Sequence, residues 1–523
     1  MKKLMLGNEA VARGLYEAGC KFVSSYPGTP STEITEEAAK YEEIYAEWAP
    51  NEKVAMESAF GASLAGSRSF CAQKHVGLNV AADPLFTLSY TGVNGGLVIA
   101  VADDPGMHSS QNEQDSRHYA IAAKVPMLEP SDSQEAKDFA KLAYEISEEF
   151  DTPVILRMIT RISHAQSLVE LCDRVEAEEK EFTKNPGKYV MMPANAVKRH
   201  VVVEERTAKL TAFAEESSIN RIDEGTSDEM GIITSSTCYN YVKEVCGDRY
   251  PVLKIGMINP LPVEKIKSFA KGVKGVVVVE ELDGIIESHC NNIGVAVKGK
   301  EIFSMLGEFS QQTVAKGLGV AYEGGEKFNE TIPPRPPVLC AGCPHRGIFY
   351  LLNKNKIKVL GDIGCYTLGA LAPLSALDST ICMGASISGI HGFIKSHPEN
   401  AGSTVAVIGD STFMHSGMTG LVNIAYNESN STVIILDNSI TGMTGHQQNP
   451  TTGFNLKGDP ASKVNLEELV KSIGIKDVTV VDPYNLKESE EAIKGALSRN
   501  NPSVIISRRP CALLKYVKHN KPL

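Results

Sequence analysis

The run Thr404-Val405-Ala406-Val407-Ile408-Gly409-Asp410-Ser411 is an apolar stretch that ends in a polar turn, and a second stretch, residues 431–436, ends in Asp437-Asn438-Ser439-Ile440. Short apolar runs rich in β-branched residues are typical of strands buried on both faces. Residues 416–426 between them have the pattern of a helix, so this order predicts two parallel strands of an α/β sheet. Ligand sites in such sheets lie at the carboxyl ends of strands, which places Asp410 and Asn438 at the same edge.

This edge carries ligands that Mg²⁺ prefers. Mg²⁺ takes about six oxygen ligands and usually only a few from protein. The Asp410 carboxylate, the Asn438 amide oxygen and the Ile440 carbonyl would supply half, and two diphosphate oxygens and a water would complete the shell. Gly409 would let the backbone approach a phosphate, and the following helix N-terminus favours an anion. Either polar tripeptide alone is also compatible with a simple turn.

The pair resembles the thiamine diphosphate motif, Gly-Asp-Gly followed at a distance by Asn, with Ser411 in place of the second glycine. Thiamine enzymes also need a glutamate that hydrogen-bonds N1′ of the aminopyrimidine, and burial tunes the protonation of such a group. Residues 51–66 predict a helix that begins at Glu52 and carries small residues on one face. Glu52 precedes Gly61 by nine positions, the spacing this helix shows in thiamine enzymes, and Glu57 is the competing candidate.

The composition is that of a soluble globular protein: 523 residues, 42% hydrophobic, 22% charged, with a net charge of −11. At roughly 150 residues per domain this length predicts about three domains. The absence of a basic stripe disfavours nucleic acid as a partner. The sequence contains no run of about 18 apolar residues, so we expect no membrane-spanning helix. The N-terminus meets Asn8 and Glu9 before a signal-peptide core can form, so we expect a cytoplasmic protein.

Three blocks alternate strand-like with helix-like stretches, and they predict α/β domains over residues 1–195, 196–330 and 338–523. A charged connector, 172–188, precedes the first boundary. The paired prolines in 333–337 forbid a helix and predict an extended linker before the last block. The middle block contains no catalytic constellation.

Eleven cysteines are dispersed along the chain. In the cytosol most of them should be reduced and buried as small apolar side chains. Cys340 and Cys343 form a C-x₂-C pair after the linker, and Cys365 and Cys511 follow separately. Four thiolates can hold a 4Fe–4S cluster, and C-x₂-C suits zinc equally well. Four unbridged core cysteines are the third alternative.

Other motifs carry a more specific resemblance. Ser25-Tyr26-Pro27-Gly28-Thr29-Pro30-Ser31-Thr32 resembles the Tyr-Pro-x-Thr-Pro-Ser signature of 2-oxoacid:ferredoxin oxidoreductases. With residues 74–81, 102–106 and 340–346, the whole chain resembles the α subunits of the indolepyruvate branch of that family. The resemblance implies two thiamine-diphosphate-fold domains that flank a transketolase-C-like domain: pyrimidine-binding (1–195), transketolase-C-like (196–330) and diphosphate-binding (338–523).

The resemblance also implies residue roles. Thr29 is expected to contact the keto or carboxylate oxygen of the substrate, and His75, Gln111 and Arg117 are further substrate candidates. An arginine suits a carboxylate, although a salt bridge would explain Arg117 equally well. The cofactor-binding set is completed by Gly364 and Tyr366. The contexts of the four cysteines resemble the ligands of the cluster nearest thiamine in pyruvate:ferredoxin oxidoreductases.

The implied activity is oxidative decarboxylation of an aryl 2-oxoacid. CO₂ leaves, coenzyme A captures the acyl group, and electrons pass singly through iron–sulfur to ferredoxin or a similar carrier. A small β subunit is expected, in an α2β2 assembly. Relatives continue into a ferredoxin-like tail, whereas residues 512–523 hold no cysteine, so the final acceptor stays open. The alternatives are a non-redox thiamine decarboxylase or carboligase and a non-catalytic partner subunit, the latter disfavoured by intact Glu52, Asp410 and Asn438.

Overall fold

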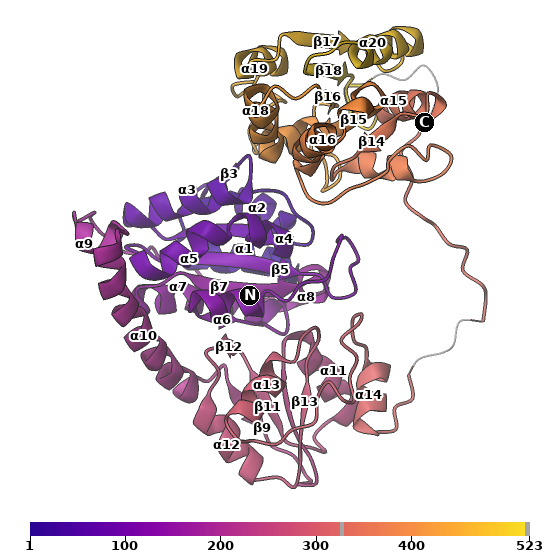
Figure 1. The fold of residues 1–523 in the computed structure, drawn as a ribbon. Coiled ribbons are helices and arrows are strands. Elements are labelled where there is room, and N and C mark those ends of the chain that lie inside the picture. Colours follow the sequence, from indigo (N-terminus) through magenta and orange to yellow (C-terminus); the bar gives the residue numbers. More distant parts are fainter. Residues whose placement is uncertain (325–328, 518–523) are drawn as a thin grey trace. The chain divides into compact units, whose positions relative to one another are not determined.

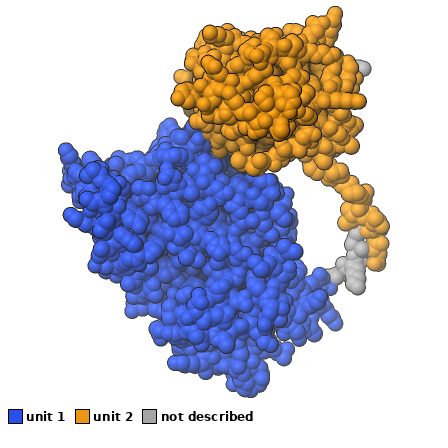
Figure 2. All heavy atoms as spheres, viewed as in Figure 1, with its two compact units in different colours: residues 1–328 blue, residues 329–523 orange. Residues whose placement is uncertain are grey.

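The structure is a computed structural model that describes residues 1–324 and 329–517. It forms two compact units, Met1–Phe328 and Asn329–Leu523, coloured separately in Figure 2. Parallel sheets dominate both units, which confirms the predicted α/β class. Among the described residues, no helix combines the length and apolar character needed to cross a membrane.

The first unit is built on a seven-stranded sheet of order β12-β6-β7-β5-β4-β2-β3 (Figure 1). All residues of its three central strands β4, β5 and β7 are buried, as expected of parallel strands covered on both faces. Its strands are β2 (Phe22–Ser25), β3 (Tyr45–Trp48), β4 (Ser69–Lys74), β5 (Leu97–Asp103), β6 (Met127–Leu128), β7 (Val154–Ile159) and β12 (Met257–Asn259). A separate antiparallel pair joins β1 (Lys2–Leu6) to β8 (Gln166–Glu170).

Helices connect these strands. The predicted helix at 51–66 is α3, and the Asn51 side chain caps it by accepting from Val54 N at 2.9 Å, so that Glu52 is its first residue. The helices are α1 (Gly7–Glu17), α2 (Thr32–Ala38), α3 (Glu52–Leu64), α4 (His75–Val80), α5 (Ala82–Thr91), α6 (Arg117–Ala123), α7 (Ser133–Phe150) and α8 (Thr160–His164).

The middle block has its own sheet, of order β13-β10-β11-β9, with β9 antiparallel at one edge. Its strands are β9 (Arg221–Asp223), β10 (Gly231–Ser235), β11 (Val252–Ile255) and β13 (Val276–Val279). Helices α9 (Pro186–Tyr189) and α10 (Pro193–Glu216) lead from the first block into this one, whose other helices are α11 (Ser236–Cys246), α12 (Val263–Lys271), α13 (Ile285–Asn292) and α14 (Gln311–Leu318). Since α10 begins at Pro193, the boundary expected at 195 falls in its first turn.

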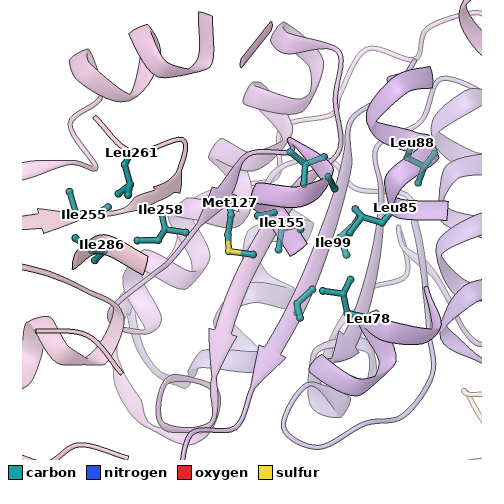
Figure 3. Packing of buried hydrophobic residues seen from close by; sticks show 14 of the residues in the cluster. Leu78, Leu85, Leu88, Ile99, Met127, Ile155, Ile255, Ile258, Leu261 and Ile286 are labelled. Atoms are coloured by element: carbon teal, nitrogen blue, oxygen red, sulfur yellow. The ribbon is translucent and has the colours of Figure 1, made fainter. Parts of the chain in front are cut away.

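A continuous apolar core joins the two sheets of this unit (Figure 3). Leu85 and Ile99 of the first block belong to the same cluster as Ile255, Ile258 and Ile286 of the middle block. In addition, β12 pairs with β6 and so extends the first sheet with middle-block residues. The first two predicted blocks therefore pack as one compact unit.

The second unit has a five-stranded parallel sheet of order β14-β15-β16-β18-β17. The apolar runs predicted as strands are β15 and β16, which pair in parallel. Its strands are β14 (Lys358–Leu360), β15 (Thr404–Gly409), β16 (Thr432–Asp437), β17 (Asp477–Val481) and β18 (Ser503–Arg508). Its helical segments are α15 (His345–Lys354), η1 (Cys365–Ala370), α16 (Ala385–Ser396), η2 (Pro398–Ser403), α17 (Asp410–Thr412), η3 (Phe413–Gly417), α18 (Met418–Tyr426), α19 (Leu466–Ile473) and α20 (Leu486–Ser498).

Candidate active site

Three oxygens meet at the carboxyl edge of the second sheet. Asp410 follows β15 and Asn438 follows β16, and both side chains are buried. The Asn438 amide oxygen faces the Ile440 carbonyl and the Asp410 carboxylate: exchanging the amide atoms would put a nitrogen 2.8 Å from Ile440 O and 3.2 Å from Asp410 Oδ1. The sequence prediction that these three residues gather at one edge therefore matches the geometry.

The close approach of these three oxygens has two physical explanations. Turning the amide would replace repulsion by hydrogen bonds. Alternatively, a cation between the oxygens removes the repulsion. An octahedral Mg²⁺ with ligands at 2.0–2.1 Å places neighbouring oxygens about 2.9 Å apart, and the separations of 2.8 and 3.2 Å bracket that value. The donor set, a carboxylate with an amide and a carbonyl oxygen, also suits a hard cation.

The electrostatics of Asp410 agree with a cation-binding role. Burial, followed by the nearby Asp437 carboxylate, raises the pKa of Asp410 to about 7. The hydroxyl of Thr451 donates to Asp410 Oδ2 at 2.8 Å, which leaves Oδ1 on the Asn438 side. A divalent cation would hold the carboxylate ionised despite its burial.

His345 supports the oxygen-inward orientation of Asn438. Its ring nitrogen Nε2 lies 3.5 Å from Asn438 Nδ2. Burial lowers the pKa of His345 to about 4, so the ring is neutral and its nitrogen can accept from the amide. The sequence prediction missed this residue, although it stands two positions after Cys343 in the C-x₂-C-Pro-His run.

Tyr366 packs on two of the predicted cofactor-site glycines. A Cβ at Gly364 would lie 2.3 Å, and one at Gly409 2.6 Å, from the same ring carbon of Tyr366. Tyr366 also packs edge-on against His345, at 6.1 Å between ring centroids. The Ser411 hydroxyl accepts from Thr441 Oγ1 at 2.8 Å. Gly364, Tyr366, Gly409 and Ser411 thus gather at the same edge, where the glycines are required by the tyrosine ring.

The four predicted cluster cysteines also come together in this unit. Burial above all, and then the neighbouring thiols Cys340, Cys365 and Cys511, raise the pKa of Cys343 to about 12. All four are free thiols. Asn438 connects them to the oxygen trio, because its backbone carbonyl accepts from Cys511 N at 2.9 Å.

A zinc ion and a 4Fe–4S cluster would require different spacings of the cysteine sulfurs. Tetrahedral zinc with Zn–S bonds of about 2.3 Å brings its sulfurs within about 3.8 Å of one another. Across residues 1–324 and 329–517, no three His, Cys, Asp or Glu side chains are grouped to hold one metal ion. In a 4Fe–4S cluster each thiolate binds a different iron, so the sulfurs lie farther apart. The cluster, zinc and four unbridged cysteines all stay predictions.

In the first unit, Glu52 and Glu57 occupy different environments. Glu52 is 5% exposed, and a Cβ at Gly77 would lie 2.6 Å from its Oε1. Glycine at position 77 therefore leaves room for the Glu52 carboxylate. The Glu57 side chain is 48% exposed and pairs with Lys53 on the helix surface. Burial favours Glu52 as the cofactor glutamate.

The predicted substrate residues lie in dissimilar places. Thr29 is half-buried in the loop after β2, and Gln111 is exposed in the loop after β5. His75 is buried, with Nε2 3.2 Å from Ser110 Oγ, and its Nδ1 has no partner among the described residues.

Arg117 is 2% exposed and all of its terminal nitrogens are engaged. Its guanidinium pairs with Asp115 at 2.6 Å and with Glu280 at 2.5 Å, and it donates to the Glu281 and Asp283 carbonyls. These contacts join the first block to the middle block. They supply a structural role for Arg117, and its substrate role stays a prediction.

Two families match the chain. The family described as pyruvate flavodoxin/ferredoxin oxidoreductase, thiamine diphosphate-binding, matches residues 13–227, and the thiamine pyrophosphate enzyme C-terminal TPP-binding domain matches 362–507. Indolepyruvate oxidoreductase subunit IorA of Archaeoglobus fulgidus is 44% identical over 98% of this chain and 87% of its own length. The subunit of the same name from Methanothermobacter thermautotrophicus is 40% identical over 100% and 89%.

A solved structure shares the fold. A 2-oxoglutarate:ferredoxin oxidoreductase from Magnetococcus marinus aligns with a TM-score of 0.53 at 18% identity, covering 61% of this chain and 65% of that one. The full-length relatives and the thiamine-binding families matched in both units establish the relationship. The chain belongs to the IorA family of indolepyruvate oxidoreductase subunits, within the thiamine diphosphate-dependent 2-oxoacid:ferredoxin oxidoreductases.

Proposed function

We propose that the chain catalyses the oxidative decarboxylation of aryl 2-oxoacids of the indolepyruvate type. One 2-oxoacid anion, one coenzyme A thiol and two oxidised ferredoxins give one acyl-CoA, one CO₂, two reduced ferredoxins and one proton. The supporting observation is the position of Asn438. Its side-chain oxygen belongs to the oxygen trio with Asp410 and Ile440, and its backbone carbonyl accepts from Cys511 N. Asn438 thus contacts both the residues proposed for the cofactor and one of the cysteines proposed for the cluster.

Asp410, Asn438 and Ile440 would hold Mg²⁺ and, through it, the diphosphate of the cofactor. Glu52 would hydrogen-bond the aminopyrimidine and control its protonation. When bound, thiamine diphosphate supplies the electron sink that allows a 2-oxoacid to lose CO₂. Thr29 would contact the substrate beside it.

Cys340, Cys343, Cys365 and Cys511 would hold a 4Fe–4S cluster that accepts electrons one at a time. Burial raises the pKa of the Cys343 and Cys365 thiols, and bound iron would offset the cost of ionising them. The cytoplasm, where thiols stay reduced, suits eleven free cysteines.

The aryl substrate rests on the relatives named indolepyruvate oxidoreductase subunit. Coenzyme A and ferredoxin rest on the family resemblance. The word subunit in those names supports a partner chain, for which we propose a small β subunit in an α2β2 assembly.

Anaerobic turnover tests the proposal. Full-length chain is combined with its partner subunit, Mg²⁺, thiamine diphosphate, coenzyme A, a viologen dye and a panel of 2-oxoacids. We expect dye reduction that is fastest with aryl 2-oxoacids and is lost in Asp410→Ala. An absence of dye reduction with every 2-oxoacid contradicts the proposal. Release of CO₂ without dye reduction indicates the non-redox decarboxylase instead.

A further inference from the structure

A buried lysine lies beside the predicted substrate loop of the first unit. Lys74 is the last residue of β4 and is only 7% exposed. A Cβ at Gly28 would lie 3.2 Å from the Lys74 Cβ, which places Lys74 against the Gly28-Thr29 turn after β2. Because β2 and β4 are adjacent parallel strands, both features occupy the carboxyl edge of the sheet, where ligands bind.

No carboxylate among the described residues lies within ion-pair distance of this ammonium, and the Asp104 charge acts on it only from farther away. Among the described residues, Lys74 forms no ion pair, and its Nζ donates to the backbone carbonyl of Ser109. The charge of Asp104 acts on Lys74, but the hydrogen bonds of this carboxylate go elsewhere: Oδ2 accepts from Ser109 N at 2.8 Å and Ser110 Oγ at 2.6 Å, and Oδ1 from Thr160 Oγ1 at 2.6 Å.

A buried cation without a directly bonded counter-ion is costly, because burial removes its hydration and a more distant charge such as that of Asp104 only partly compensates. Burial lowers the pKa of Lys74 to about 8, which still leaves the group mostly protonated at neutral pH. The other buried lysines are paired. Lys137 lies 3.2 Å from Glu17, and Lys254 contacts Glu135. Lys74 differs from them in lacking such a partner.

His75 provides a second observation at the same place. It follows Lys74 directly and contacts the same loop through Ser110, and its buried Nδ1 has no partner in the described part of the chain. A buried nitrogen without a hydrogen-bond partner next to an ammonium without an ion-pair partner marks a position where an anionic ligand would bind both. Arg117, the other cationic candidate for binding the substrate, already forms ion pairs with Asp115 and Glu280.

We infer that Lys74 is the residue that binds the carboxylate of the 2-oxoacid substrate, with His75 Nδ1 as a neighbouring hydrogen-bonding group. The inference rests on the proposed function, because it takes a 2-oxoacid as the ligand. An ammonium–carboxylate contact in a water-poor site is charge-assisted and sets specificity for a free acid over its neutral ester. The oxidation itself does not depend on this contact.

The test compares Lys74→Met, Lys74→Arg and the surface control Lys40→Met, whose side chain is 66% exposed. The measurements are calorimetric binding of 2-oxoacids and of thiamine diphosphate with Mg²⁺ to the full chain, and KM and kcat in the complete complex. We expect Lys74→Met to raise the Kd and KM for 2-oxoacids about 10- to 100-fold, as charge-assisted bonds do. Cofactor affinity should be unchanged, and Lys74→Arg should recover part of the loss.

The methyl ester of the same 2-oxoacid gives a measurement that needs no variant. Wild type should bind the acid at least 10-fold more tightly than the ester, and Lys74→Met should lose that preference. The inference is overturned if Lys74→Met keeps the wild-type KM, or if wild type binds the acid and the ester equally well. It is also overturned if Lys74→Met loses cofactor binding because it no longer folds. If 2-oxoacids bind in a Lys74-dependent way without dye reduction, the proposed function fails and the inference stands; if dye is reduced with unchanged KM, the reverse holds.

Discussion

The substitution Gly77→Ala tests the proposed role of Glu52 in cofactor activation most directly. A Cβ at position 77 would lie 2.6 Å from Glu52 Oε1, 2.7 Å from its Cγ and 2.9 Å from its Cδ. Ordinary van der Waals contact begins near 3.4 Å, so the carboxylate would have to move by about 0.8 Å. The clashing atoms belong to the Glu52 side chain and not to the backbone, and position 77 lies in helix α4, where alanine is favoured over glycine. The variant should fold normally.

A displacement of about 1 Å at a catalytic group can lower a rate by about 10²-fold. Proton transfer by a positioned side chain contributes about 10²–10⁴-fold. We therefore expect Gly77→Ala to slow exchange of the C2 proton of bound thiamine diphosphate, and turnover, by about 10- to 100-fold. Affinity for Mg²⁺ and the diphosphate should change little, because their proposed ligands lie in the second unit.

The assay is deuterium exchange at C2, followed by NMR on the full chain with its partner subunit, Mg²⁺ and cofactor. Gly61→Ala is the matched control: it lies on the same helix as Glu52, and a Cβ there meets nothing within 4 Å. Exchange at the wild-type rate in Gly77→Ala, with the cofactor bound, would show that Glu52 does not control cofactor activation. An equal loss in Gly61→Ala would point to a general effect on the helix.

Three further variants test the remaining contacts. His345→Phe removes the acceptor facing Asn438 and should weaken calorimetric binding of thiamine diphosphate with Mg²⁺ about 10-fold, the loss of one net hydrogen bond; unchanged affinity would exclude that orienting role. Cys343→Ser should lower the iron content of anaerobically purified protein, whereas Cys172→Ser should not, and equal iron in both would count against the cluster. Arg117→Met should lower the free energy of unfolding by about 3–5 kcal/mol because it strands buried carboxylates; a stable variant with a raised substrate KM would favour the substrate role. Burial raises the pKa of Asp115, but Arg117 and then Arg157 lower it, and the pKa is lowered overall. The contribution of Asp115 to stability is therefore present above the usual carboxyl range and is lost as pH falls through the lower folded value, which acid unfolding would measure.

The cofactor edge of the second unit was predictable because it depends on local order. Two apolar strands in sequence, each followed by a ligand residue, suffice to place Asp410 beside Asn438. The choice of Glu52 over Glu57 also followed from the motif spacing, and burial now favours the same residue. These inferences need no knowledge of distant contacts.

Contacts between residues far apart in the chain could not be predicted from the sequence. Arg117 stands 163 positions from Glu280, so the pattern could not separate a structural ion pair from a substrate ligand. Gly77 and His345 matter through packing against Glu52 and Asn438, which no spacing indicates. The compact unit formed by the first two blocks also arises from distant pairing, since β12 joins the sheet edge at β6.

The number of electrons released for each CO₂ distinguishes oxidation of the decarboxylated substrate to acyl-CoA from its protonation to an aldehyde. Anaerobic reactions of the full complex with an aryl 2-oxoacid, coenzyme A and a one-electron viologen should yield two reduced viologens and one acyl-CoA for each CO₂, with no aldehyde. This outcome is expected if the thiolates beside Asn438 hold a cluster that removes electrons from the cofactor site. CO₂ accompanied by an equal amount of aldehyde, with the dye still oxidised, would contradict the assignment of this chain as an oxidoreductase.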